Sequence, residues 1–92
     1  MPDHDIATLQ DIRAMIDMAD EMILRGLSAR FKGVEFLRRL KKLNSLRITD
    51  PARERELKDR WKKLAKEMKV PEPLALLILD VILVESKRLQ ES

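Results

Sequence analysis

Hydrophobic residues recur along the first part of the chain in alternating steps of four and three, which is the spacing of one helix face. The repeat starts near Thr8 and ends near Leu43, and no proline interrupts it. We call this face the seam; it consists of Leu9, Arg13, Ile16, Asp20, Ile23, Leu27, Arg30, Val34, Leu37 and Lys41. The pattern predicts one long helix over about residues 8–43. Gly26 and Gly33 each cost about 1 kcal/mol of helix propensity relative to alanine, so a break near Gly33 is the main alternative to a single helix.

Two shorter helices are predicted in the second half of the chain. Asp50 and Pro51 form a helix start, because aspartate accepts hydrogen bonds at the N-cap and proline fits the first helical position. This helix is predicted over about residues 51–69, with the apolar stripe Leu57, Trp61, Leu64 and Met68. After two prolines near residue 72, a third helix is predicted over about residues 72–90. Its apolar stripe is Ala75, Leu79 and Ile82, which continues into Ser86 and Gln90. The expected fold class is all-α, in one domain of residues 1–92.

The length of the first helix predicts a second copy of the chain. At 1.5 Å per residue this helix would span about 54 Å, whereas a compact globule of this size has a diameter of roughly 32 Å. Two shorter helices cannot cover such a rod. We therefore expect a homodimer, in which the apolar face of this helix is covered by another chain, most simply a twofold partner.

Composition excludes several kinds of chemistry. The chain has no cysteine and one histidine, His4, so a thiolate metal site, a zinc cage or a histidine-based triad is not expected. No metal or other cofactor is predicted. The 19 basic and 16 acidic residues nearly cancel, and aromatic residues make up 3%, which argues against a nucleic-acid partner.

The sequence also gives no indication of a membrane partner. The longest apolar stretch, Leu74–Val84, is interrupted by Asp80 and is shorter than the about 20 residues that a bilayer span needs. It predicts a buried helix instead. The first residues lack the basic and apolar segments of a targeting peptide, so a cytoplasmic location is expected.

Charged residues occupy positions of the seam where packing favours apolar ones, namely Arg13, Asp20, Arg30 and Lys41. Each could reach solvent or pair locally, but several cations on one seam favour a positively charged pocket for a small anion with carboxylates. Arg13 and Arg30 lie about 26 Å apart along one helix. In an antiparallel pair of long helices, Arg13 of one chain would lie opposite Arg30 of the other, which predicts two pockets shared between the chains.

Polar residues also extend the other two stripes, and each has a simpler structural interpretation. Asp50 is explained by its N-cap position, and Arg53 by solvent exposure. Glu54 lies one turn after Asp50, where a nearby cation or a substrate hydroxyl would relieve repulsion. Ser86 could bond back to a carbonyl of its own helix, and Gln90 lies near the end of the chain.

Together these residues resemble the all-helical chorismate mutases, which are intertwined three-helix homodimers. The resemblance covers Ile12–Asp20 (IRAMIDMAD), Arg30, Lys41, Ile48–Glu54 (ITDPARE) and Glu85–Gln90 (ESKRLQ). It implies that Arg13 enters from the partner chain and, with Arg30, holds the two carboxylates of chorismate. It further implies that Lys41 and Gln90 donate to the breaking ether oxygen and that Glu54, helped by the Asp50 backbone, binds the ring hydroxyl. Arg53 and Ser86 would support the carboxylate sites.

The reaction implied by the resemblance is the pericyclic rearrangement of chorismate to prephenate in aromatic amino-acid biosynthesis. This step needs no nucleophile, metal or obligatory proton transfer. Catalysis would come from holding the reactive conformer and stabilising charge on the ether oxygen. Any regulation would come through a partner enzyme of the same pathway.

Three alternatives stay open at this point. One is an isochorismate pyruvate lyase of the same fold, and another is a non-catalytic helical dimer that regulates a partner enzyme. The third is a helical adaptor or nucleic-acid binder in which Arg38, Arg39, Lys41 and Lys42 form a phosphate-facing patch.

Overall fold

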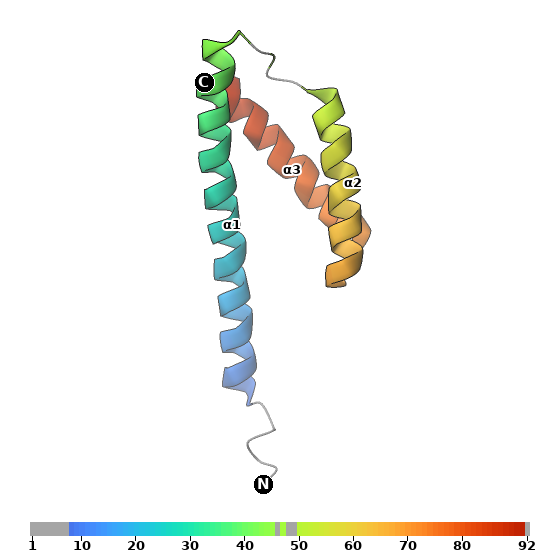
Figure 1. The fold of residues 1–92 in the computed structure, drawn as a ribbon. Coiled ribbons are helices and arrows are strands. Elements are labelled where there is room, and N and C mark those ends of the chain that lie inside the picture. Colours follow the sequence, from blue (N-terminus) through green and yellow to red (C-terminus); the bar gives the residue numbers. More distant parts are fainter. Residues whose placement is uncertain (1–7, 46, 48–49, 92) are drawn as a thin grey trace. The chain divides into compact units, whose positions relative to one another are not determined.

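Three α-helices make up the structure, a computed structural model that describes residues 8–45, 47 and 50–91. They are α1 (Leu9–Leu43), α2 (Pro51–Met68) and α3 (Glu72–Glu91) (Figure 1). The predicted all-α class, with one long and two shorter helices, is confirmed. His4 and the motif residues Ile48 and Thr49 lie outside the described residues.

The chain forms two compact units, residues 1–32 and residues 33–92, and each is considered by itself. Helix α1 continues without a break through Gly26 and Gly33, so the predicted single long helix is present. The helix is rich in good helix formers such as leucine, methionine, arginine and glutamate, which outweigh the propensity cost of the two glycines. A Cβ atom added at either glycine would meet nothing within 4 Å, so packing inside the chain does not require glycine at these positions.

Side chains and special backbone angles define the helix ends. At the start of α1, the backbone N–H of Asp11 donates to Thr8 Oγ1 and the N–H of Thr8 donates to Asp11 Oδ2, both at 3.1 Å. The hydrogen bond from the Thr8 backbone, followed by that with its side chain, lowers the pKa of the Asp11 carboxyl. At the start of α2, Asp50 Oδ1 accepts from the backbone N–H of Arg53 at 3.1 Å, and Pro51 follows it. The expected Asp-Pro helix start is therefore present.

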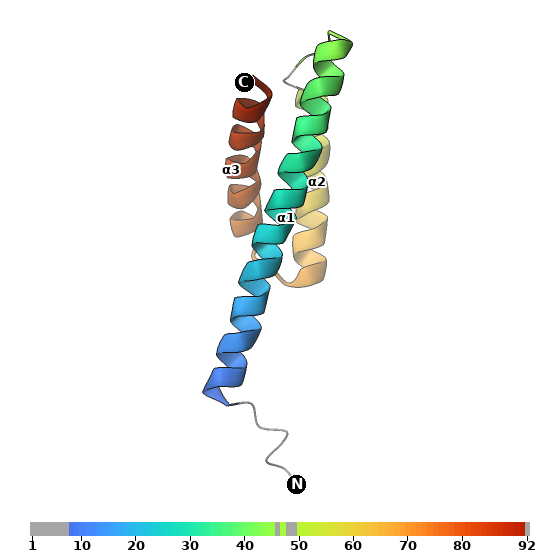
Figure 2. The same ribbon diagram turned by 90° about the vertical axis from the view of Figure 1, so that its left-hand side faces the viewer.

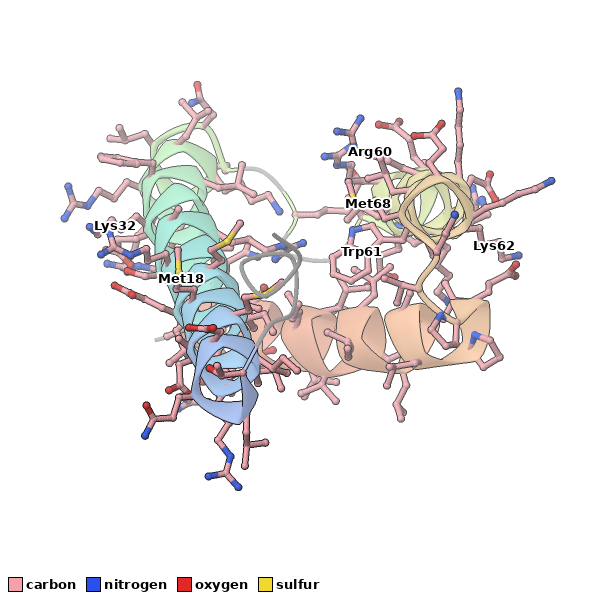
Figure 3. All side chains as sticks on the ribbon, turned by 90° about the horizontal axis from the view of Figure 1, so that it is seen from below. Met18, Lys32, Arg60, Trp61, Lys62 and Met68 are labelled. Carbon is pink, nitrogen blue, oxygen red and sulfur yellow. The ribbon has the colours of Figure 1, made fainter. Side chains whose placement is uncertain are left out.

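The second unit is built on the antiparallel pair α2 and α3. Figures 1 and 2 show α2 and α3 running in opposite directions, and the two helices pack against each other. The predicted stripe of α3 is buried, with Leu79 at 0% exposure. In Figure 3, Trp61 is directed from α2 toward α3, whereas Lys62 points outward. The buried apolar residues are Val34, Ala65, Ala75, Leu79 and Ile82.

Much of the apolar surface of the single chain stays exposed. Leu74–Val84, expected to be a buried helix, is buried on one face only, because Leu77 and Val81 are exposed by 61% and 63%. In the first unit no described residue is buried. Its exposed large apolar side chains are Leu9, Ile12, Met15, Ile16, Met18, Met22, Ile23 and Leu24. None of the helices, over the described residues, has the length and hydropathy of a bilayer-crossing segment.

Helix α2 ends on a residue in a backbone conformation that glycine adopts more easily than other residues do. Lys69 has φ 59° and ψ 40°, in the left-handed region, and its N–H turns back toward the carbonyls of Ala65 and Lys66. The next N–H, of Val70, donates to the carbonyl of Ala65 at 2.9 Å, which completes a helix-ending motif usually built with glycine. Because an L-residue pays about 1–2 kcal/mol for this conformation, the end of α2 carries a small strain.

We expect Lys69→Gly to raise the free energy of unfolding by about 1 kcal/mol, because glycine adopts a positive φ without strain. Urea denaturation followed by circular dichroism measures the change. The matched control is Lys62→Gly, an exposed site inside α2, which should lower the stability by about 1 kcal/mol. A destabilising Lys69→Gly would show that the left-handed turn does not form.

Candidate active site

The ends of α1 and α3 meet at a hydrogen bond between two residues far apart in sequence. The ammonium of Lys41 donates to Oε1 of Gln90 at 2.9 Å, and both side chains are half-buried. Gln90 Nε2 also donates to the carbonyl of Ser86, at 3.4 Å, near the upper limit for a hydrogen bond. Figure 1 shows the last turns of α3 beside the end of α1. A cation and an amide, both expected to lie on apolar stripes, are thus brought together.

One turn before Gln90, Ser86 is a buried polar residue of α3. Its exposure is 5%, and its hydroxyl donates to the carbonyl of Ile82 at 2.7 Å. This is the back-bonding interpretation weighed from the sequence, and it satisfies the hydroxyl without a ligand. No buried side-chain nitrogen or oxygen among the described residues lacks a hydrogen-bond partner.

Glu54 lies beside a cation that the sequence pattern did not single out. Lys87 Nζ lies 2.7 Å from Glu54 Oε1, and the two side chains are exposed by 38% and 26%. This ion pair joins α3 to α2, and it supplies the nearby cation that Glu54 was expected to need. A half-exposed pair of this kind contributes about 0–1 kcal/mol to stability. The missed signal was that Lys87 lies one turn after Leu83 on the half-buried flank of α3.

We call the residues at this end of the second unit the polar end: Lys41, Glu54, Ser86, Lys87 and Gln90. Its polar groups come from all three helices.

The other two predicted residues of the second unit have local partners. The Asp50 carboxylate caps α2 through the N–H of Arg53, so its side chain has the structural role weighed from the sequence. The Arg53 guanidinium pairs with Glu56 one turn along the same helix, and both are exposed. Neither side chain has a described contact with the polar end.

Arg13 and Arg30 belong to the first unit. Arg13 and the seam residue Asp20 are exposed, while Arg30 is half-buried. At 1.5 Å per residue the two arginines are about 26 Å apart along α1, so one copy of the helix does not bring them together.

Three of the four cations of the alternative phosphate-facing patch are engaged within the chain, whereas Lys42 is exposed. Arg38 and Arg39 contact Glu35 at 2.9 Å and 3.4 Å, and Lys41 contacts Gln90. The hydrogen bond from Arg38 is the main cause of the lowered pKa of the Glu35 carboxyl, and the pKa of Arg38 is raised in return. These contacts weaken the nucleic-acid interpretation, since a phosphate-binding patch needs cations directed outward.

An apolar pocket of about 250 Å³ lies where α2 turns into α3. Its lining consists of Trp61, Leu64, Ala65, Met68, Val70, Ala75 and Ile78. None of these side chains is charged, so the pocket has no cation to pair with a carboxylate. The polar end is therefore the better candidate for binding a charged metabolite.

The fold and this site define a class, that of small all-helical proteins with cationic and amide groups set between helices. Comparison with known proteins then identifies the family, because residues 12–91 match chorismate mutase type II. A chorismate mutase from Methanocaldococcus jannaschii is 33% identical over 86 residues, which cover 94% of this chain and 87% of that protein. No solved structure matches the chain. The chain belongs to the chorismate mutase type II family, whose members are isomerases that convert chorismate to prephenate.

We expect the Lys41–Gln90 contact to contribute to folding as well. Because the donor is charged and half-buried, its coupling energy should be about 1 kcal/mol. The measurement is a double-mutant cycle of Lys41→Met, Gln90→Leu and the combined variant in urea denaturation. Additive effects of the two substitutions would mean that the side chains do not interact in solution.

Proposed function

We propose that this protein rearranges chorismate to prephenate in pockets that two copies of the chain share. The observation that carries the proposal is the contact between Lys41 and Gln90, at 2.9 Å. The family resemblance assigns both residues to the ether oxygen of the substrate. Two hydrogen-bond donors that converge from different helices suit that task, since charge builds on the ether oxygen as its bond to carbon lengthens.

A second copy is supported by the exposed apolar side chains of the first unit. Ile16 and Ile23 of the seam are exposed by 55% and 61%, and no described residue of that unit is buried. Most of the stability of a helix in a protein comes from packing of its apolar face, and a large exposed apolar surface of this kind marks an interface. The occupant that we propose is the same segment of a second copy, because a twofold pair covers both surfaces at once.

Two arginines from different chains would hold the two carboxylates. Along one chain Arg13 and Arg30 are about 26 Å apart. In an antiparallel pair of α1 helices, however, Arg13 of one copy would lie opposite Arg30 of the other. A guanidinium forms two parallel hydrogen bonds with a carboxylate. Held at both carboxylates, the substrate is kept in its compact conformer, with the reacting carbons near each other.

The polar end would then act on the bond that breaks. In the concerted step the ether C–O bond breaks as the new C–C bond forms, and no proton leaves the substrate. Lys41 contacts Oε1 of Gln90, so the Nε2 donor of that amide is the end directed elsewhere. Its long contact with the Ser86 carbonyl, 3.4 Å, would cost little to exchange for the ether oxygen. Glu54 would accept from the ring hydroxyl, with Asp50, Arg53 and Ser86 in supporting roles.

A partner enzyme of the same pathway and a cytoplasmic location stay predictions.

Incubating the purified protein with chorismate or isochorismate and identifying the product distinguishes the proposed mutase from the alternatives. Loss of the chorismate diene absorbance with formation of prephenate supports the mutase. Salicylate and pyruvate formed from isochorismate would indicate the lyase, and an inert protein would indicate a regulatory role.

We expect Arg30→Ala and Lys41→Ala each to lower kcat/KM by about 10²–10³-fold, because each removes a charged donor from the substrate. Chorismate consumption measures the rate, and size-exclusion chromatography checks that the dimer persists. The matched controls are Arg25→Ala and Lys42→Ala, which remove exposed cations of α1 and should leave the rate near that of the wild type. Unchanged rates for both site variants would refute these assignments.

Mixing Arg13→Ala chains with Arg30→Ala chains should restore activity. Each mixed dimer has one pocket with both arginines, so random exchange gives about a quarter of the wild-type rate. Subunit exchange is followed independently by mass-tagging one variant. Complete exchange without recovery would show that the two arginines do not serve one shared pocket.

A further inference from the structure

The ion pair between Glu54 and Lys87 has a feature that stability alone does not explain. Pairs such as Arg25–Glu21 and Arg88–Glu85 join neighbours along one helix. Lys87 instead reaches from α3 to Oε1 of Glu54 on α2, at 2.7 Å. Glu54 continues the apolar stripe of α2, and Lys87 continues the flank of α3 beside buried Ser86. Apolar side chains at both positions would pack the two helices at no cost in desolvation, so packing alone does not account for the two charges.

The pair also lies next to the groups proposed for the ether oxygen. On α3, Lys87 precedes Gln90 by one helical turn, about 4.5 Å along the axis. Gln90 in turn accepts from Lys41. The contacts Glu54–Lys87 and Lys41–Gln90 therefore occupy consecutive turns of the same helix, and Glu54 is anchored beside the proposed reacting bond.

Taking the proposed function as given, we propose that Lys87 is a positioning residue that aims Glu54 at the ring hydroxyl of the substrate. The ammonium holds Oε1, and the second oxygen of the carboxylate can accept a hydrogen bond from a hydroxyl. Lys87 has a second effect, which is electrostatic. A carboxylate beside a doubly negative substrate repels it, and an ammonium 2.7 Å from that carboxylate offsets the repulsion.

The test compares Lys87→Met, which keeps much of the stem and removes the charge, with Lys87→Arg, which keeps the charge. The hydroxyl contact exists in both the bound substrate and the transition state, so its loss raises KM more than it lowers kcat. We expect Lys87→Met to raise KM for chorismate about tenfold with kcat within about threefold of the wild type. Lys87→Arg should restore KM to within about threefold, and Lys62→Met, an exposed cation of α2, is the control.

A purely structural role gives a different pattern. Partial unfolding of Lys87→Met would lower the apparent kcat and the melting temperature together and leave KM unchanged. That pattern, or kinetics equal to those of the wild type, would overturn the positioning role.

A double-mutant cycle distinguishes positioning from direct contact with the substrate. If Lys87 acts through Glu54, Lys87→Met should have little further effect on KM in a Glu54→Gln background. An equal tenfold effect in both backgrounds would overturn the proposal in favour of direct binding. A wild-type protein that forms no prephenate would overturn the proposed function as well, whereas an active wild type with an unaffected Lys87→Met refutes the positioning role alone.

Discussion

The hydrogen bond between Lys41 and Gln90 is the constraint on which the proposed site depends. It connects the end of α1 to the end of α3 through two side chains at positions where apolar residues would pack better. A charged donor to a neutral amide is among the stronger hydrogen bonds available in a half-buried place. The contact engages Oε1 of the Gln90 amide, and both side chains are half-buried. The contact therefore brings together the two groups that the proposed function assigns to the ether oxygen.

The apolar core of the single chain is small, so a single chain leaves much of its apolar surface without a packing partner. Among the described residues, the buried apolar ones are chiefly small or β-branched, and Leu79 is the largest fully buried side chain. One face of α3 is covered by α2, but Leu77, Val81 and Val84 stay exposed. A chain of 92 residues buries only about two-thirds of its unfolded surface even when compact. A second copy would supply the missing apolar contacts and the missing arginine at the same time, so folding and function would share one interface.

The sequence predicted the helices because their signals are local. Asp50 and Pro51 mark the start of α2, the prolines near residue 72 separate α2 from α3, and the seam extends without proline to Leu43. The partner of Glu54 was not predictable in this way. Lys87 has acidic and basic neighbours on its own helix, and only the packing of α2 against α3 brings its ammonium to Glu54. Lys41 and Gln90 were both singled out, but their contact depends on tertiary packing that no local spacing encodes.

The distribution of polarity along α2 and α3 links stability to function. At the turn between them the pocket is lined by apolar side chains, from Trp61 to Ile78. At the opposite end the same two stripes finish in Glu54, Ser86 and Gln90, with Lys87 beside them. Apolar residues at those positions would bury more surface and bind the helices more tightly. Polar residues there weaken the packing of the single chain. Such departures from optimal packing are expected at functional sites.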